Sequence, residues 1–129
     1  MAGESILIVD DNPANLKLAR VLLLSEGYSV RTAQDAAQAL DAIAAARPRL
    51  ILMDLQLPGM DGLELTRRIK GNPETQGIII LALTSYAMKG DQAKALAAGC
   101  DDYFSKPIDT VALPMAIARH LARGLGETP

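Results

Sequence analysis

Along the chain, short continuous apolar runs alternate with stretches in which apolar residues recur every third or fourth position. Continuous runs of this kind are typical of strands buried on both faces of a sheet. The sequence predicts five strands, over residues 5–9, 28–33, 50–53, 78–83 and 102–105. The second strand differs, because residues 28–33 alternate apolar and polar positions like a strand with one exposed face.

A helix is expected after each strand, ended by a glycine at Gly27 and again at Gly99. The first four helices are expected over residues 13–26, 35–46, 62–70 and 91–98. In the second helix, Asp35 is expected to be the N-cap. Its apolar face is predicted to consist of Ala37, Leu40, Ile43 and Ala44.

The last helix contains a local conflict between a cap and a proline. Asp109 could cap a helix start, but Pro114 would then fall inside the helix and remove a backbone hydrogen bond. We therefore expect the regular helix to begin near Pro114 and to run to about Arg123. Residues 124–129, which contain two glycines and end in a proline, are expected to form a tail or the stub of a linker.

Five strand–helix repeats in succession predict a parallel sheet with helices on both faces. We expect the flavodoxin-like α/β fold, a three-layer (βα)5 sandwich with strand order 2-1-3-4-5. This order puts the half-exposed second strand at an edge and the apolar first and third strands at the centre. It also places a ligand crevice at the carboxyl ends of the first and third strands.

The composition limits the class of protein. The chain has 129 residues, a length that fits a single domain over residues 1–129. Its 13 Lys plus Arg and 15 Asp plus Glu give a net charge of −2, so there is no electrostatic field that would attract nucleic acid or an anionic membrane. A single Cys100 excludes a disulfide framework and fits a reducing compartment. No apolar run approaches the roughly 20 residues of a membrane span, and no signal peptide is recognisable. We expect a cytoplasmic protein.

Each strand except the second is followed by, or ends in, a distinctive polar group. These groups are Asp10 and Asp11 after the first strand, Asp54 after the third, Thr84 after the fourth and Lys106 after the fifth. Because the carboxyl ends of parallel strands share one edge, we expect the groups to converge. Two carboxylates about 4 Å apart repel by about 4 kcal/mol at an effective dielectric constant of 20.

Three carboxylates with one lysine leave a net negative charge, so either one carboxylate stays protonated or a hard divalent cation binds. Ligands that are all oxygen atoms favour Mg²⁺ or Mn²⁺ over zinc. A cation, a hydroxyl and a lysine around a carboxylate form a phosphoryl site. Carboxylates form acyl phosphates, so Asp54 is the expected nucleophile.

Four sequence motifs carry a resemblance to a known family. They are Val9-Asp10-Asp11-Asn12, the segment from Met53 through Asp54 to Gly62, Leu83-Thr84 and Lys106-Pro107. In order and spacing they resemble the receiver domain of two-component response regulators, over about residues 5–121. The resemblance implies that Asp54 accepts a phosphoryl group from a phosphohistidine on a histidine kinase or a histidine phosphotransfer protein.

The resemblance also implies a role for each site residue. Mg²⁺, for which Mn²⁺ can substitute, is bound by Asp11, Asp54 and the backbone carbonyl of Gln56, while Asp10 acts through water. Lys106 pairs with the phosphoryl oxygens, and Thr84 donates its hydroxyl to them.

Further expectations concern the switch. Tyr103 is the rotating switch aromatic, and the Lys106–Pro107 bond is expected to be cis. Gln56 and Tyr86 tune the lifetime of the phosphoryl group. The output is expected to be a changed surface on the fourth helix, fifth strand and fifth helix, and a downstream protein is expected to bind this surface. The chain is therefore expected to act as a signalling switch and not as an enzyme that turns over a metabolite.

Alternatives remain open at this point. Tyr103 could serve only in packing, and His120 is expected to be a surface histidine. No output domain follows Arg123, so the chain is either a stand-alone receiver, which its early Met1 favours, or a receiver excised from a hybrid kinase or larger regulator. A different class, a small Mg²⁺-dependent aspartyl-phosphate phosphohydrolase, is disfavoured because Asp10 and Asp11 are adjacent and no inserted cap is present.

Overall fold

The five predicted strands and five predicted helices are all present. The structure, a computed structural model, describes residues 3–57, 62–84 and 91–124. The strands are β1 (Ser5–Val9), β2 (Ser29–Ala33), β3 (Leu50–Asp54), β4 (Ile79–Thr84) and β5 (Asp102–Ser105). The helices are α1 (Pro13–Ser25), α2 (Ala36–Ala45), α3 (Gly62–Lys70), α4 (Asp91–Ala98) and α5 (Ala112–Gly124).

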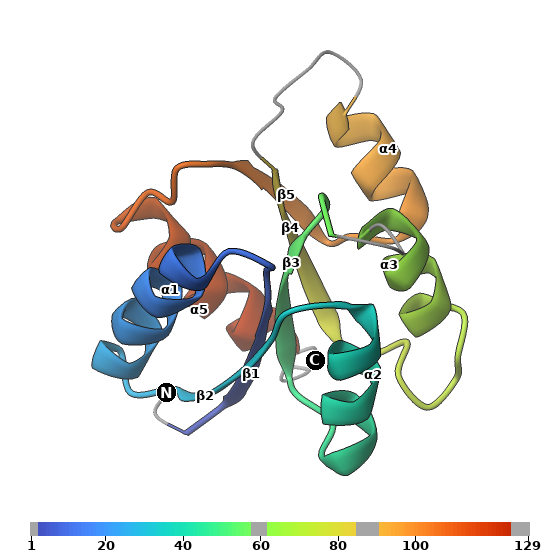
Figure 1. The fold of residues 1–129 in the computed structure, drawn as a ribbon, viewed down its shortest axis with the longest axis horizontal. Coiled ribbons are helices and arrows are strands. Elements are labelled where there is room, and N and C mark those ends of the chain that lie inside the picture. The colour runs from blue at the N-terminus through green and yellow to red at the C-terminus, as the bar shows by residue number, and fades with distance from the viewer. Residues whose placement is uncertain (1–2, 58–61, 85–90, 125–129) are drawn as a thin grey trace.

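The strands form one parallel sheet in the order β2-β1-β3-β4-β5, which confirms the predicted flavodoxin-like α/β topology. Helices α1 and α5 cover one face of the sheet, and α2, α3 and α4 cover the other (Figure 1). Each face has its own apolar core. Leu16, Leu23 and Ile117 pack on the first face, and Ile43, Leu65 and Ala95 pack on the second.

Burial along the strands explains the strand order. In β3 all five residues are buried, as expected of a strand with helices on both faces and neighbours on both sides. In β2 only Ala33 is fully buried, and Ser29 and Thr32 are exposed. The alternating sequence of β2 therefore occupies the edge of the sheet, as predicted.

The predicted apolar face of α2 is confirmed at Ile43 and is wrong at Ala37, Leu40 and Ala44. Ala36, Ala39 and Ile43 are buried, whereas Ala37 and Ala44 are exposed and Leu40 is 37% exposed. Asp35 is the N-cap, as predicted, and accepts a hydrogen bond from the N–H of Gln38 at 2.8 Å. Because alanines occur on every side of this helix, the pattern of apolar residues did not determine which face would pack on the sheet.

The predicted start of the last helix is also wrong. Asp109 Oδ1 accepts hydrogen bonds from the N–H groups of Val111 and Ala112 at 2.9 and 2.8 Å, and the regular helix begins at Ala112. Pro114 lies in the first turn, where backbone N–H groups need no partner within the helix, so it costs little there. Gly124 belongs to α5 and not to a tail; residues 125–129 of the expected tail lie outside the described residues.

The expectation for His120 requires a further correction. Its side chain is 11% exposed, and its Nε2 lies 2.8 Å from Asp102 Oδ2, so it is a partly buried, paired residue of α5. Cys100 is buried. In the described ranges no helix is both long and apolar enough to cross a membrane.

Candidate functional site

The sheet brings the predicted polar groups to one edge. Val9, the last residue of β1, is paired with Met53 of β3. Asp10 comes directly after Val9 and Asp54 directly after Met53, so the two aspartates come from neighbouring strand ends. Thr84 ends β4 and is paired with Ser105, the residue before Lys106. The register of the parallel strands therefore determines which of these side chains are neighbours.

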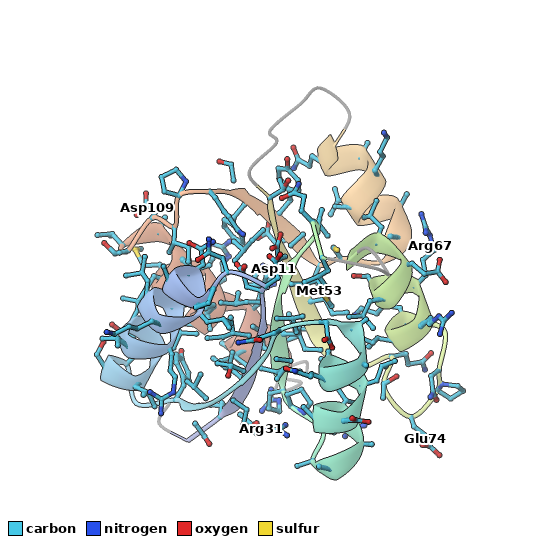
Figure 2. All side chains as sticks on the ribbon, in the orientation of Figure 1. Asp11, Arg31, Met53, Arg67, Glu74 and Asp109 are labelled. Atoms are coloured by element: carbon cyan, nitrogen blue, oxygen red, sulfur yellow. The ribbon has the colours of Figure 1, made fainter. Side chains whose placement is uncertain are left out.

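Three carboxylates cluster at this edge. One oxygen atom from each of Asp10, Asp11 and Asp54 lies within 4.8 Å of the others. Asp10 and Asp54 are each only 2% exposed, whereas Asp11 is exposed. Figure 2 shows Asp11 at the carboxyl edge of the sheet, just beyond the end of β1.

Lys106 pairs with two of these carboxylates. Its Nζ lies 2.9 Å from Asp10 Oδ2 and 3.3 Å from Asp54 Oδ2. Burial would by itself lower the pKa of Lys106, but the hydrogen bond that its ammonium group donates to Asp10 and the charges of Asp54 and Asp10 outweigh this effect and raise the pKa. The lysine is therefore charged at neutral pH and offsets part of the negative charge.

Asp54 has its pKa raised above the usual value. Desolvation is the largest cause, and repulsion by Asp10 adds to it. A hydrogen bond from the N–H of Gln56 to Asp54 Oδ1, at 2.9 Å, and the ammonium group of Lys106 act in the opposite direction. The ionised form of Asp54 is therefore less favoured than that of an ordinary aspartate, although Lys106 lies beside it.

A small cavity of about 170 Å³ opens onto these groups. Its lining residues are Asp10, Asp11, Asn12, Asn15, Asp54, Gln56 and Lys106. Carboxylate and amide oxygens are the ligands that hard divalent cations such as Mg²⁺ prefer, and the excess negative charge favours such a cation. The donor set therefore fits a magnesium-type site.

Asn12 shapes the mouth of this cavity. Its backbone N–H donates to Asp10 Oδ1 at 2.9 Å, and its side chain caps α1 by accepting hydrogen bonds from the N–H groups of Ala14 and Asn15. Asp10 is thereby held in position, and α1 begins directly beside the carboxylates. Asn12 belongs to the first sequence motif, but its role as the N-cap of α1 is visible only in the structure.

Thr84 reaches the site through another residue. It is 1% exposed, is not among the residues that line the cavity, and its Oγ1 accepts a hydrogen bond from Gln56 Nε2. The sequence analysis placed both residues near Asp54 but did not foresee their contact. No local sequence signal could have shown it, because the two residues belong to different strand ends.

The remaining predicted site residues are placed as follows. Tyr103 is half-buried and packs against the core of the face covered by α2, α3 and α4. The Lys106–Pro107 peptide bond is cis, the geometry that the resemblance implies. Tyr86 and residues 58–61 of the second motif lie outside the described residues.

The sequence analysis missed one ionic cluster, at the other end of β5. Asp102 Oδ2 accepts from His120 at 2.8 Å and lies 3.6 Å from Arg119 of α5. Asp102 Oδ1 accepts a hydrogen bond from the N–H of Tyr103 at 2.9 Å. The cluster ties α5 to β5 next to Tyr103.

Comparisons with known proteins identify the family. The model of the response regulator receiver domain matches residues 6–118. The polar-differentiation response regulator DivK of Brucella anthropi is 44% identical over 105 residues, which are 81% of this chain and 85% of that protein. Its counterpart from Brucella melitensis is 43% identical over the same share of both chains.

Solved structures agree with this match. A CheY-like response regulator receiver domain protein from Methanospirillum hungatei is 32% identical and has a TM-score of 0.90, with 98% of this chain and 99% of that chain covered. The receiver domain of the sensor histidine kinase PA1611 from Pseudomonas aeruginosa is 37% identical and has a TM-score of 0.85, with 94% and 99% covered. Its crystal structure has a magnesium ion coordinated in the active-site cleft.

These matches decide between the function classes left open by the sequence. A phosphohydrolase of small molecules is set aside, because the family model covers nearly the whole described chain and the acidic cluster lies at the expected strand ends. The family consists of signalling domains and not of enzymes that turn over a metabolite. The chain belongs to the response regulator receiver domain family of two-component signalling systems.

Proposed function

We propose that this receiver is a phosphorylation-activated switch in which Asp54 accepts the phosphoryl group. The observation that carries the proposal is the position of Asp54: it is 2% exposed, lines the small cavity, and lies beside Lys106 and two further carboxylates. Membership of the family implies a histidine kinase as partner. Our proposal extends this to a phosphohistidine donor on the kinase or on a histidine phosphotransfer protein.

The transfer is a substitution at phosphorus. An oxygen of the Asp54 carboxylate forms a bond to phosphorus, the bond between phosphorus and the histidine nitrogen breaks, and that nitrogen keeps the electron pair and is neutral or protonated afterwards. Lys106, which is charged at neutral pH, pairs with the phosphoryl oxygens. The hydroxyl of Thr84 donates to them. Fixed donors of this kind stabilise the charge that spreads over the oxygens in the transition state.

A divalent cation completes the site in this proposal. Asp11, Asp54 and the backbone carbonyl of Gln56 would hold Mg²⁺ or Mn²⁺, and Asp10 would act through water. When bound, the cation neutralises charge on the phosphoryl oxygens and on the carboxylates. The acidic cluster and the magnesium ion in the homologous cleft of PA1611 support this assignment.

The output of the switch is proposed to follow from Thr84 and Tyr103. When the phosphoryl group engages Thr84, the space beside it changes and the ring of Tyr103 turns inward. The surface formed by α4, β5 and α5 then binds a downstream protein. Gln56 and Tyr86 are proposed to tune the lifetime of the phosphoryl group. We further propose that residues 1–129 form one receiver domain and that the protein works in the cytoplasm.

Phosphorylation by a small donor tests the acceptor. Intact-mass measurement after incubation with acetyl phosphate and Mg²⁺ is expected to show one added phosphoryl group, which is absent in the presence of a chelator. The Asp54→Asn variant is expected to show no addition. Asp41→Asn, which removes an exposed carboxylate of α2, is the matched control and is expected to be labelled like the wild type. Labelling of Asp54→Asn to the wild-type level would contradict the assignment.

A further inference from the structure

Gln56 contacts two functional groups of the site through two different parts of the residue. Its backbone N–H donates to Asp54 Oδ1 at 2.9 Å, and its side-chain Nε2 donates to Thr84 Oγ1. The first contact is to the last residue of β3 and the second is to the last residue of β4. Gln56 therefore connects the ends of two neighbouring strands at the proposed phosphoacceptor.

Thr84 is held in place by its backbone and by its burial. Its backbone carbonyl accepts a hydrogen bond from the N–H of Lys106 at 2.8 Å, so the backbone of Thr84 is fixed. Its side chain is buried behind the lining of the cavity, of which Gln56 is a part. Because the backbone is fixed, the direction in which the Thr84 hydroxyl points depends on rotation of the side chain. Gln56 Nε2 donates a hydrogen bond directly to the oxygen of this hydroxyl.

The chemistry of the two groups assigns the direction of the hydrogen bonds. A threonine hydroxyl has one hydrogen to donate and two lone pairs that accept, whereas the glutamine NH₂ group only donates. When Nε2 donates to Oγ1, it occupies a lone pair and leaves the hydroxyl hydrogen for another acceptor. A donor that is oriented before phosphoryl transfer costs no reorganisation in the transition state.

We infer that Gln56 is a positioning residue for Thr84: its side-chain amide holds the hydroxyl so that the hydrogen is directed to the phosphoryl oxygens. This inference rests on the proposed function. It assigns to the amide a role in phosphoryl transfer that is distinct from the metal contact proposed for the backbone carbonyl of the same residue. In this inference the amide acts through Thr84, and this dependence can be measured.

A double-mutant cycle tests the dependence. Gln56→Met removes the amide and keeps the backbone groups, and Thr84→Val removes the hydroxyl with little change of shape. The measured quantity is the rate of phosphorylation by acetyl phosphate at saturating Mg²⁺. Gln56→Met is expected to slow the reaction about fivefold when Thr84 is present, the worth of one neutral hydrogen bond. It is expected to have almost no effect in the Thr84→Val background, because the two residues act as a unit.

Equal effects in both backgrounds, or no slowing when Thr84 is present, would overturn the inference. Gln56→Asn, which keeps an amide but shortens the side chain, is a second variant and is expected to behave like Gln56→Met. Gln92→Met is the matched control, because Gln92 is exposed on α4. If the wild type itself is not phosphorylated, the proposed function fails; if it is phosphorylated and the cycle is additive, only this inference fails.

A second readout needs neither metal nor phosphoryl group. In the unphosphorylated, Mg²⁺-free protein, the rotamer of Thr84 can be measured by NMR from couplings to its labelled methyl group. The wild type is expected to show one rotamer, and Gln56→Met is expected to show a mixture. A single unchanged rotamer in Gln56→Met would overturn the inference, because the amide would then not be what orients the hydroxyl.

Discussion

Asp54 shows how one residue can be costly for folding and useful for function. It is almost completely buried, it lies beside two other carboxylates, and only one ammonium group faces it within ion-pair distance among the described residues. The raised pKa of Asp54 reports this imbalance, with desolvation as its main cause. The same imbalance makes the site attractive to a divalent cation.

A stability prediction follows from the sign of this shift. Because the pKa of Asp54 is raised in the folded state, the stability contributed by its protonated form is present below the unfolded value of 3.8 and is lost as pH rises through the folded pKa. Asp54→Asn mimics the uncharged form. We therefore expect it to increase the free energy of unfolding at neutral pH in the presence of a chelator.

Urea denaturation of the wild type and Asp54→Asn, at neutral pH and at a pH well below the unfolded value of 3.8, measures this difference. The two curves are expected to converge at the lower pH, where Asp54 is protonated in both folded and unfolded states. An Asn variant less stable than the wild type at neutral pH would contradict the account of the charge balance.

At the scale of elements, the first residues of α1 and α3 contact the strand ends that carry the site. Asn12 caps α1 beside Asp10, and Gly62 begins α3 against the end of β3, with its N–H donating to the carbonyl of Leu55 at 3.2 Å. Both contacts fix how a helix leaves the edge that carries the carboxylates. These capping and packing details depend on only a few atoms, which makes them sensitive to substitution.

Gly62 is predicted to tolerate no side chain. A Cβ atom there would lie 2.5 Å from the carbonyl oxygen of Asp54 and 2.7 Å from Leu55 Cα, both backbone atoms that cannot easily move. Gly62→Ala is expected to destabilise the protein by about 1–3 kcal/mol, the usual cost of overpacking. Thermal or urea unfolding measures the change. Gly77→Ala is the control, since a Cβ there meets nothing within 4 Å, and a loss as large in this control would contradict the steric explanation.

Asp109 gives a pH-dependent prediction for α5. Hydrogen bonds from the N–H groups of Ala112 and Val111 lower the pKa of its carboxyl below the usual 3.8. Its contribution to stability is therefore present above pH 3.8 and is lost as pH falls through the lowered folded pKa. Asp109→Ala is expected to lower the unfolding temperature at neutral pH and to have less effect in acid.

Asp109→Asn, which can cap without a charge, separates the two contributions. It is expected to lie between the wild type and Asp109→Ala at neutral pH and to show a flatter pH profile than the wild type. A pH-independent difference between the wild type and Asp109→Ala would mean that the charge of the cap contributes nothing.

At the scale of the whole molecule, the proposed cation site is expected to make the free energy of unfolding depend on Mg²⁺. The proposed ligands come from the ends of β1 and β3 at the centre of the sheet, so they are brought together only in the folded chain. A cation that binds only the folded state stabilises it by about 2.7 kcal/mol at a concentration 100 times its dissociation constant. Adding Mg²⁺ is therefore expected to raise the unfolding temperature, and a chelator is expected to reverse the effect.

Asp11→Ala is expected to weaken this response to Mg²⁺, because an exposed ligand is lost while the buried core is unchanged. Asp35→Asn, which keeps the cap of α2, is a control expected to respond like the wild type. An equal shift in unfolding temperature for Asp11→Ala and the wild type would contradict the proposed ligand set.

The sequence alone determined the order of strands and helices, the position of the half-exposed strand and the residue types at the strand ends. These follow from local periodicity and from motifs that keep their order along the chain. It did not determine which face of α2 packs, because alanines surround that helix. Nor did it determine where α5 begins, because the cap of Asp109 outweighs the effect of Pro114.

Only the tertiary structure decided which side chains touch. Lys106 pairs with Asp10 across 96 positions of the chain, Gln56 donates to Thr84 across 28, and His120 contacts Asp102 across 18. Such contacts depend on the register of parallel strands and on the packing of helices, which join segments that share no local pattern. The residues of the candidate site can therefore be proposed from the sequence, whereas the hydrogen bonds that orient them require the folded chain.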